Sequence, residues 1–179
     1  MTSPDPDAGA GSELAELLPA ITGTAGQFGH RQHIHLAFVA VRRYGMPAAV
    51  GKVCGWLRQL TAYAQAPQKY HHTVSRAWVE LVAYHADTDP GCADFEVFAG
   101  RYPALLDKRL LSRHYRSSTL ASGPARQGWV EPDLLAFPWS GRDHCSDQQN
   151  RDHHGGHHEH DGGQGDHDRA PAQRRPAAG

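Results

Sequence analysis

The sequence predicts an all-α fold: a single small helical bundle followed by a disordered C-terminal tail rich in His, Gly and Asp. Apolar residues recur at three- and four-residue intervals in several segments, which is the period of an amphipathic helix. No segment shows the sustained alternation of a strand or a strand–turn–strand pattern. From residue 140 to residue 179 there is no Val, Ile, Leu, Met, Phe, Tyr or Trp. Such a segment cannot bury enough apolar surface to offset the entropy of ordering it.

These observations divide the 179-residue chain into three parts. Residues 1–11 are rich in Pro, Gly and Asp, and we expect them to be disordered. Residues 12–139 form the helical domain, whose size is usual for one hydrophobic core. Residues 140–179 form the disordered His-rich tail.

Each helix is predicted from its own start and stop signals. The first begins at Ser12, a residue type that caps helix N-termini. The first long helix covers residues 30–44 and ends at a glycine. The next carries Pro47 in its first turn and one apolar stripe along its length. A third long helix covers residues 69–86, and a shorter one begins at Pro103.

Composition excludes several classes of function. The formal net charge is −1, so no basic surplus indicates a nucleic-acid partner. No apolar run approaches the roughly 20 residues that span a bilayer, so we expect no membrane partner. The N-terminus lacks the apolar stretch of a secretory signal, and we expect a cytoplasmic protein. Cys54, Cys92 and Cys145 lie far apart, which indicates neither a disulfide framework nor a thiolate zinc site. The sequence gives no indication of the oligomeric state.

Three histidines stand at the start of the first long helix, in the stretch GHRQHIHLAF. At about 100° per residue, His30 lies at the centre of the apolar face that includes Ile34 and Val41. His33 flanks that face, whereas His35 falls on the polar side. The third long helix repeats the arrangement, because His71 lies on the same face as its apolar residues. We therefore expect His30, His33 and His71, but not His35, to point inward.

Neutral imidazoles that converge on one pocket are typical ligands of a divalent transition metal ion. We therefore predict that His30, His33 and His71 bind one ion, either zinc, copper or iron. Tyr70, Ser75 and Trp78 are expected to surround these ligands. The alternatives are structural histidines bonded to backbone carbonyls, a metal-free catalytic histidine, or a haem site. HRQH lacks the glutamate and the spacing of HExxH, so a zinc protease is not indicated.

The stretches FGHRQHIHLAF and QKYHHTVSRAW resemble a group of small uncharacterised bacterial helical proteins. Their patterns are F-x-H-x-x-H-L-x-x-A-W and K-Y-H-E-T-I-T, about forty residues apart, and the resemblance covers about residues 28–80. It rests on these positions: Phe28, His30, His33, Ile34, Ala37, Phe38, Lys69, Tyr70, His71, His72, Thr73, Val74 and Ser75. The chain departs from the patterns at four of them: Ile34, Phe38, His72 and Ser75. The resemblance implies a helical fold and a shared histidine site, but no activity.

The tail and one cluster of basic residues suggest further binding. Histidines interleaved with Asp, Glu and Gly form a flexible ligand set for Zn(II), Ni(II), Cu(II) or Co(II). The densest of these are His153, His154, His157, His158 and His160. The basic cluster DKRLLSRHYR is expected to be the solvated face of a helix, or alternatively a contact for an anion or a carboxylate substrate. Its cations are Lys108, Arg109, Arg113 and Arg116.

Two functions follow from these patterns. The first is a small metal-dependent enzyme that uses the three-histidine site between two helices to activate water, oxygen or a small-molecule substrate. The second is a non-enzymatic metal-handling protein, such as a chaperone, buffer or sensor, that acts through its His-rich tail.

Overall fold

The described part of the chain is all-α, as the sequence predicts. The computed structural model describes residues 6–23 and 27–140, and these residues contain no strand. The α-helices are α1 (Pro6–Thr22), α2 (His30–Tyr44), α3 (Met46–Tyr63), α4 (His72–Thr88), α5 (Phe95–Arg101), α6 (Ser117–Ala121) and α7 (Gly123–Gln127). The 3-10 helices are η2 (Pro67–Lys69), η3 (Pro103–Leu106) and η4 (Lys108–Arg113). No helix within the described ranges is long and apolar enough to cross a membrane.

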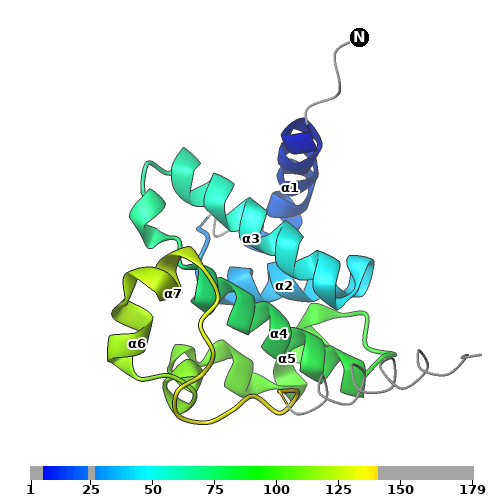
Figure 1. Ribbon diagram of the computed structural model, residues 1–179. Helices are drawn as coiled ribbons and strands as arrows, with labels where there is room; N and C mark the ends of the chain where they lie inside the picture. The colour runs from blue at the N-terminus through cyan, green and yellow to red at the C-terminus, as the bar shows by residue number, and fades with distance from the viewer. Residues whose placement is uncertain (1–5, 24–26, 141–179) are drawn as a thin grey trace, which may run out of the picture. The chain divides into compact units, whose positions relative to one another are not determined.

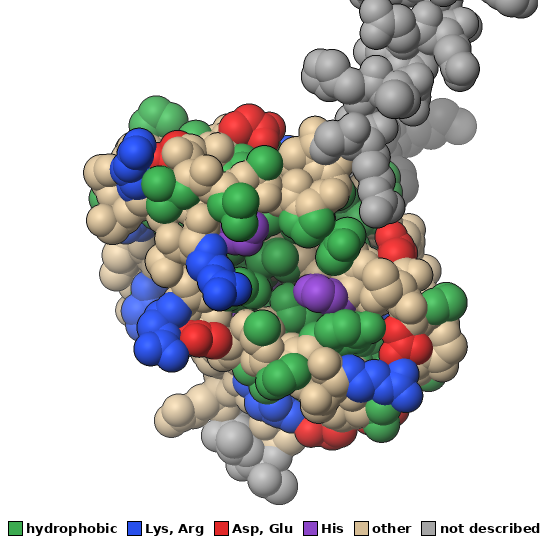
Figure 2. Space-filling model, turned by 90° about the horizontal axis from the view of Figure 1, so that it is seen from below, with side chains coloured by type: hydrophobic (Ala, Val, Ile, Leu, Met, Phe, Trp, Pro, Cys, Tyr) green, Lys and Arg blue, Asp and Glu red, His purple; other side chains and the backbone are tan. Residues whose placement is uncertain are grey.

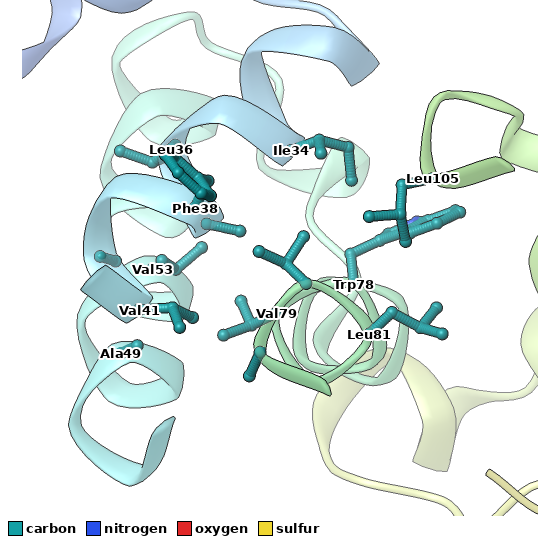
Figure 3. Packing of buried hydrophobic residues seen from close by; sticks show 14 of the residues in the cluster. Ile34, Leu36, Phe38, Val41, Ala49, Val53, Trp78, Val79, Leu81 and Leu105 are labelled. Atoms are coloured by element: carbon teal, nitrogen blue, oxygen red, sulfur yellow. The ribbon is translucent and has the colours of Figure 1, made fainter. Parts of the chain in front are cut away.

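Helices α2, α3 and α4 pack against one another and form the centre of the domain (Figure 1). α1 packs on α2 and α3, while α7 packs on α4. The apolar stripes meet in one core, in which Ile34, Val53 and Val79 are fully buried (Figure 3). This packing fixes the start of α2, which carries His30 and His33, and the start of α4, which follows His71.

The structure confirms the predicted helix of residues 30–44 and corrects three other boundaries. The first helix begins at Pro6 rather than at Ser12, because proline is tolerated in the first turn of a helix. The third long helix begins at His72, since residues 67–69 form a separate 3-10 turn. The helix predicted from Pro103 is two 3-10 turns that meet at Asp107. The Asp107 carboxylate accepts a hydrogen bond from the Arg109 amide at 3.0 Å, which caps the second turn.

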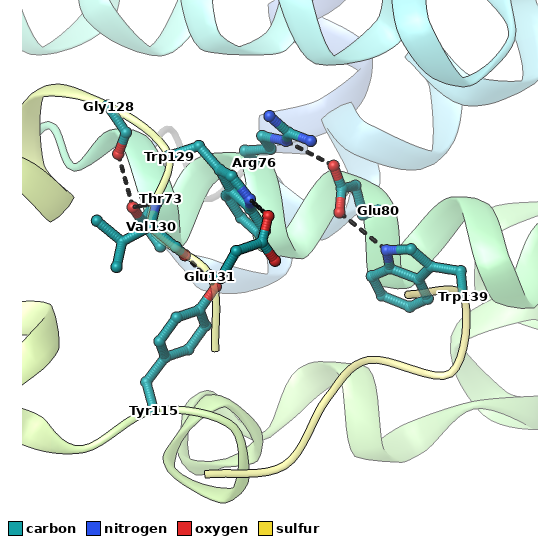
Figure 4. Close-up of polar contacts among 9 residues, drawn as sticks. All are labelled: Thr73, Arg76, Glu80, Tyr115, Gly128, Trp129, Val130, Glu131 and Trp139. Atoms are coloured by element: carbon teal, nitrogen blue, oxygen red, sulfur yellow. Dashed lines mark hydrogen bonds and ion pairs between the residues drawn. The ribbon is translucent and has the colours of Figure 1, made fainter. Parts of the chain in front are cut away.

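Partly buried hydrogen bonds join the segment after α7 to α4 (Figure 4). The Thr73 hydroxyl donates to the Gly128 carbonyl at 2.7 Å and accepts from the Val130 amide at 3.2 Å. The Glu80 carboxylate accepts from Arg76 at 2.6 Å and from the Trp139 indole at 3.0 Å. These bonds hold the segment across α4 without regular secondary structure.

Candidate functional site

The start of α2 is shaped by a reciprocal cap. The Gly29 amide donates to the Gln32 side chain at 3.1 Å, and the His33 amide donates to the Gly29 carbonyl at 3.0 Å. These bonds begin the helix at His30. His30 and His33 are three residues apart in its first turns, so both lie on one face.

His30 is anchored through one ring nitrogen. Its Nε2 lies 3.0 Å from the Leu105 carbonyl oxygen. A carbonyl can only accept, so Nε2 carries the proton and Nδ1 of the neutral ring keeps its lone pair. The ring packs edge-on against Trp78, with 4.6 Å between centroids. Burial lowers the pKa of His30, and Lys108 adds to this effect while the carbonyl bond opposes it.

His33 has a buried nitrogen without a partner. Among the described residues, its Nε2 is the one buried side-chain nitrogen or oxygen that makes no hydrogen bond. Burial, with a smaller contribution from His30, lowers the pKa of His33 to about 3. The imidazole is therefore neutral at physiological pH. Buried polar groups are nearly always bonded, so this atom is a candidate for binding a ligand.

His71 lies outside α4 and not in its first turn, which corrects the predicted placement. It is the N-cap residue, and its Nδ1 accepts a hydrogen bond from the Val74 amide at 3.3 Å. Its Nε2 lies 2.7 Å from the Leu120 carbonyl oxygen, to which it donates. Both ring nitrogens are thus engaged. The helical period mispredicted the position of His71 because α4 begins one residue after it, at His72, so the period does not apply to His71.

All three histidines nevertheless line one cavity of about 540 Å³. The predicted neighbours Tyr70, Ser75 and Trp78 line it too. Tyr70 bonds to His72 at 3.0 Å, and burial raises the pKa of its hydroxyl. The remaining lining residues are Phe28, Gly29, Leu57, Thr61, Lys69, Val74, Lys108, Leu111, Ser112, Tyr115, Ser117 and Leu120. A space-filling view of one face shows histidine and basic side chains beside a hollow with hydrophobic side chains in it (Figure 2).

The charged side chains of this cavity are all basic. Lys69 and Lys108 line it, and no Asp or Glu is among the described lining residues. The expectation of a solvated helix face was incomplete for Lys108, since this residue borders the cavity. Lys69 was expected only as part of the K-Y-H stretch, without a role at the site, and it lines the cavity beside Tyr70 and His71.

The residues fit a divalent metal ion at two of the three predicted positions. His33 Nε2 and His30 Nδ1 are available, whereas both nitrogens of His71 are engaged. Within the described ranges, no three His, Cys, Asp or Glu side chains form a group that could hold a metal ion. The three-histidine metal site stays a prediction.

His35 and His114 do not line the cavity. His35 stacks on Phe95 at 4.0 Å, and the buried His114 bonds to the Leu135 carbonyl at 2.8 Å. These contacts are those of structural histidines. The five tail histidines from His153 to His160 lie outside the described residues.

Comparisons of the chain with models of known protein families, with curated proteins and with solved structures find no match. The resemblance to small bacterial helical proteins therefore stays a prediction.

Proposed function

We propose that the protein is a small metal-dependent enzyme, in which His33 and His30 bind one divalent transition metal ion at the cavity. The observation that carries the proposal is the His33 Nε2 atom, which is buried without a partner in the cavity wall. Leaving such an atom unbonded costs about 1–3 kcal/mol, so it calls for a ligand that restores the lost interaction.

The low pKa of His33 favours a metal ligand over a proton-transferring base. A general base works best when its pKa lies near the working pH, and a pKa of about 3 is far below it. A metal ligand, by contrast, must be unprotonated, which His33 is throughout the neutral range. The same environment that weakens the imidazole as a base keeps it ready to coordinate.

The hydrogen bond of His30 has the form usual for a metal-binding histidine. Such residues donate their second ring N–H to a carboxylate or a backbone carbonyl, which fixes the tautomer and the ring orientation. His30 donates Nε2–H to the Leu105 carbonyl in this way. Its Nδ1 is then the coordinating atom.

A cavity beside the ligands favours an enzyme over a purely structural metal site. Structural zinc is closed by four protein ligands, whereas a catalytic ion keeps a position for water or substrate. Two protein ligands leave several positions, and about 540 Å³ is within the range of small-molecule sites. When bound, the ion would polarise a substrate or lower the pKa of a bound water. His71 in this proposal holds the wall around Leu120 in place.

Metal content measured by mass spectrometry tests the proposal on the full-length chain. The seven tail histidines are first replaced by Asn to remove their own metal binding: His144, His153, His154, His157, His158, His160 and His167. This variant should retain one zinc, copper or iron ion per chain. Adding His33→Asn should remove it, whereas adding His35→Asn, on the same helix but outside the cavity, should not. Circular dichroism establishes that each variant is folded.

The composition of the tail favours a second candidate, a metal-handling protein. Seven histidines among residues 140–179 could buffer or deliver metal without any catalysis. Metal that is lost on replacing the tail histidines, and is unaffected by His33→Asn in the otherwise natural chain, would support this candidate and contradict the enzyme.

A further inference from the structure

Two of the chain's three lysines line the cavity, and neither has an acidic partner. Lys69 ends η2 and Lys108 begins η4. Within the described ranges, neither forms a salt bridge. Lys52, the third lysine, lies elsewhere and pairs with Glu13 at 2.6 Å. The cavity therefore has two ammonium groups and no carboxylate among its described lining residues.

Three arginines, in contrast, interact with acidic or aromatic side chains. Arg109 pairs with Asp107 at 3.0 Å, and Arg76 pairs with Glu80 at 2.6 Å. Arg58 lies over the Tyr70 ring, 4.8 Å from its centroid. Among the described residues that line the cavity, Lys69 and Lys108 are the only charged ones, and both lack an acidic partner.

The cavity is polar at its mouth and mainly apolar within. Both lysines are exposed, whereas Trp78 and Leu111 are only 3% and 4% exposed. A ligand that matches these two features has an anionic end and an apolar body.

We propose that the cavity binds a small organic anion with an apolar body, whose anionic group lies at the mouth between Lys69 and Lys108. This inference names the substrate class of the proposed enzyme and rests on the same cavity, but it does not require the metal. The apolar body would pack against Trp78 and Leu111, and burial of its surface supplies most of the affinity. The lysines supply the discrimination, because exposed charge pairs are each worth about 0.2–1 kcal/mol and are screened by salt.

Binding of three naphthalene probes to the full-length protein tests the proposal. 2-Naphthoate, 2-naphthyl phosphate and neutral 2-naphthamide share one apolar body and differ in the group that would face the lysines. Dissociation constants are measured by calorimetry at low and high salt, with and without a chelator. Carboxylate and phosphate are thereby distinguished as the preferred anion. We expect at least one anion to bind about tenfold more tightly than the amide, and this preference to shrink in high salt.

The double variant Lys69→Gln/Lys108→Gln should raise the dissociation constant of the preferred anion by about five- to tenfold and leave that of the amide unchanged. Lys52→Gln is the matched control and should change neither. Equal binding of the anions and the amide would overturn the proposal, as would absence of binding by all three probes. Anion binding that is insensitive to the lysines but abolished by the chelator would also overturn it. Anion binding by a protein that holds no metal would contradict the proposed enzyme and leave this inference intact.

Discussion

Two polar regions lie on opposite faces of α4 and differ in how their buried atoms are bonded. On one face, Thr73 and Glu80 bond to the segment after α7, and their hydrogen bonds are complete. On the other face, Ser75 and Trp78 line the cavity, where His33 Nε2 has no partner.

The difference separates residues that hold the fold from residues that are available for a ligand. Thr73 satisfies one donor and one acceptor of a segment that has no ladder or helix of its own. His33 is half-buried, and its buried Nε2 makes no hydrogen bond. Stability alone favours the first arrangement over the second, so the second is the candidate for binding a ligand. Three measurements test this contrast.

The largest effect is expected on the fully bonded face. Thr73→Val should lower the free energy of unfolding by about 3 kcal/mol, because it leaves the Gly128 carbonyl and the Val130 amide without partners. Chemical denaturation measures the change. Thr73→Ser, which keeps the hydroxyl, should recover most of the loss. Equal destabilisation by both variants would show that the methyl group and not the hydroxyl is important.

The second effect is a pH dependence that comes from His33. Its pKa is about 3 in the folded state and near 6.5 in the unfolded state, so below pH 6.5 only the unfolded state takes up the proton. Stability should therefore fall as the pH decreases from 6.5 towards 3, and it should be unaffected by His33 above 6.5. Between pH 7 and pH 5 the loss amounts to about 2 kcal/mol at 1.36 kcal/mol per unit.

Denaturation of the natural chain and of His33→Leu, both with a chelator, isolates this contribution. The difference between their unfolding free energies should widen on acidification, in favour of the variant. A difference that stays constant from pH 7 to pH 5 would show that His33 has an ordinary pKa and is not buried as described.

The smallest effect is expected for His33→Leu at pH 7, where both states are neutral. The variant should be more stable than the natural chain by about 1 kcal/mol, since it removes a buried polar atom without a partner and retains the side-chain bulk. Denaturation at pH 7 with a chelator measures it. A loss of more than 1 kcal/mol would place His33 among the structural residues, beside Thr73.

Local sequence signals predicted the bounds of α2 and part of the candidate site. The apolar period and the glycine at residue 45 predict α2 within its observed bounds, His30–Tyr44. The same period places His30 and His33 on one face, and the structure has both at the cavity. These features depend on the geometry of a single helix, which the sequence alone determines.

Tertiary structure decided what each histidine can do. His71 lines the predicted cavity, but its nitrogens are engaged by Val74 and by Leu120, which lies 49 residues further along the chain. Lys108 lines the cavity from the start of η4, where Asp107 interrupts the predicted helix. Availability of a ring nitrogen depends on which distant backbone atoms lie within hydrogen-bonding distance, and helical periodicity has no information about them. The sequence by itself determined the faces of the helices, and only the packing of those faces decided that His33 would be left without a partner.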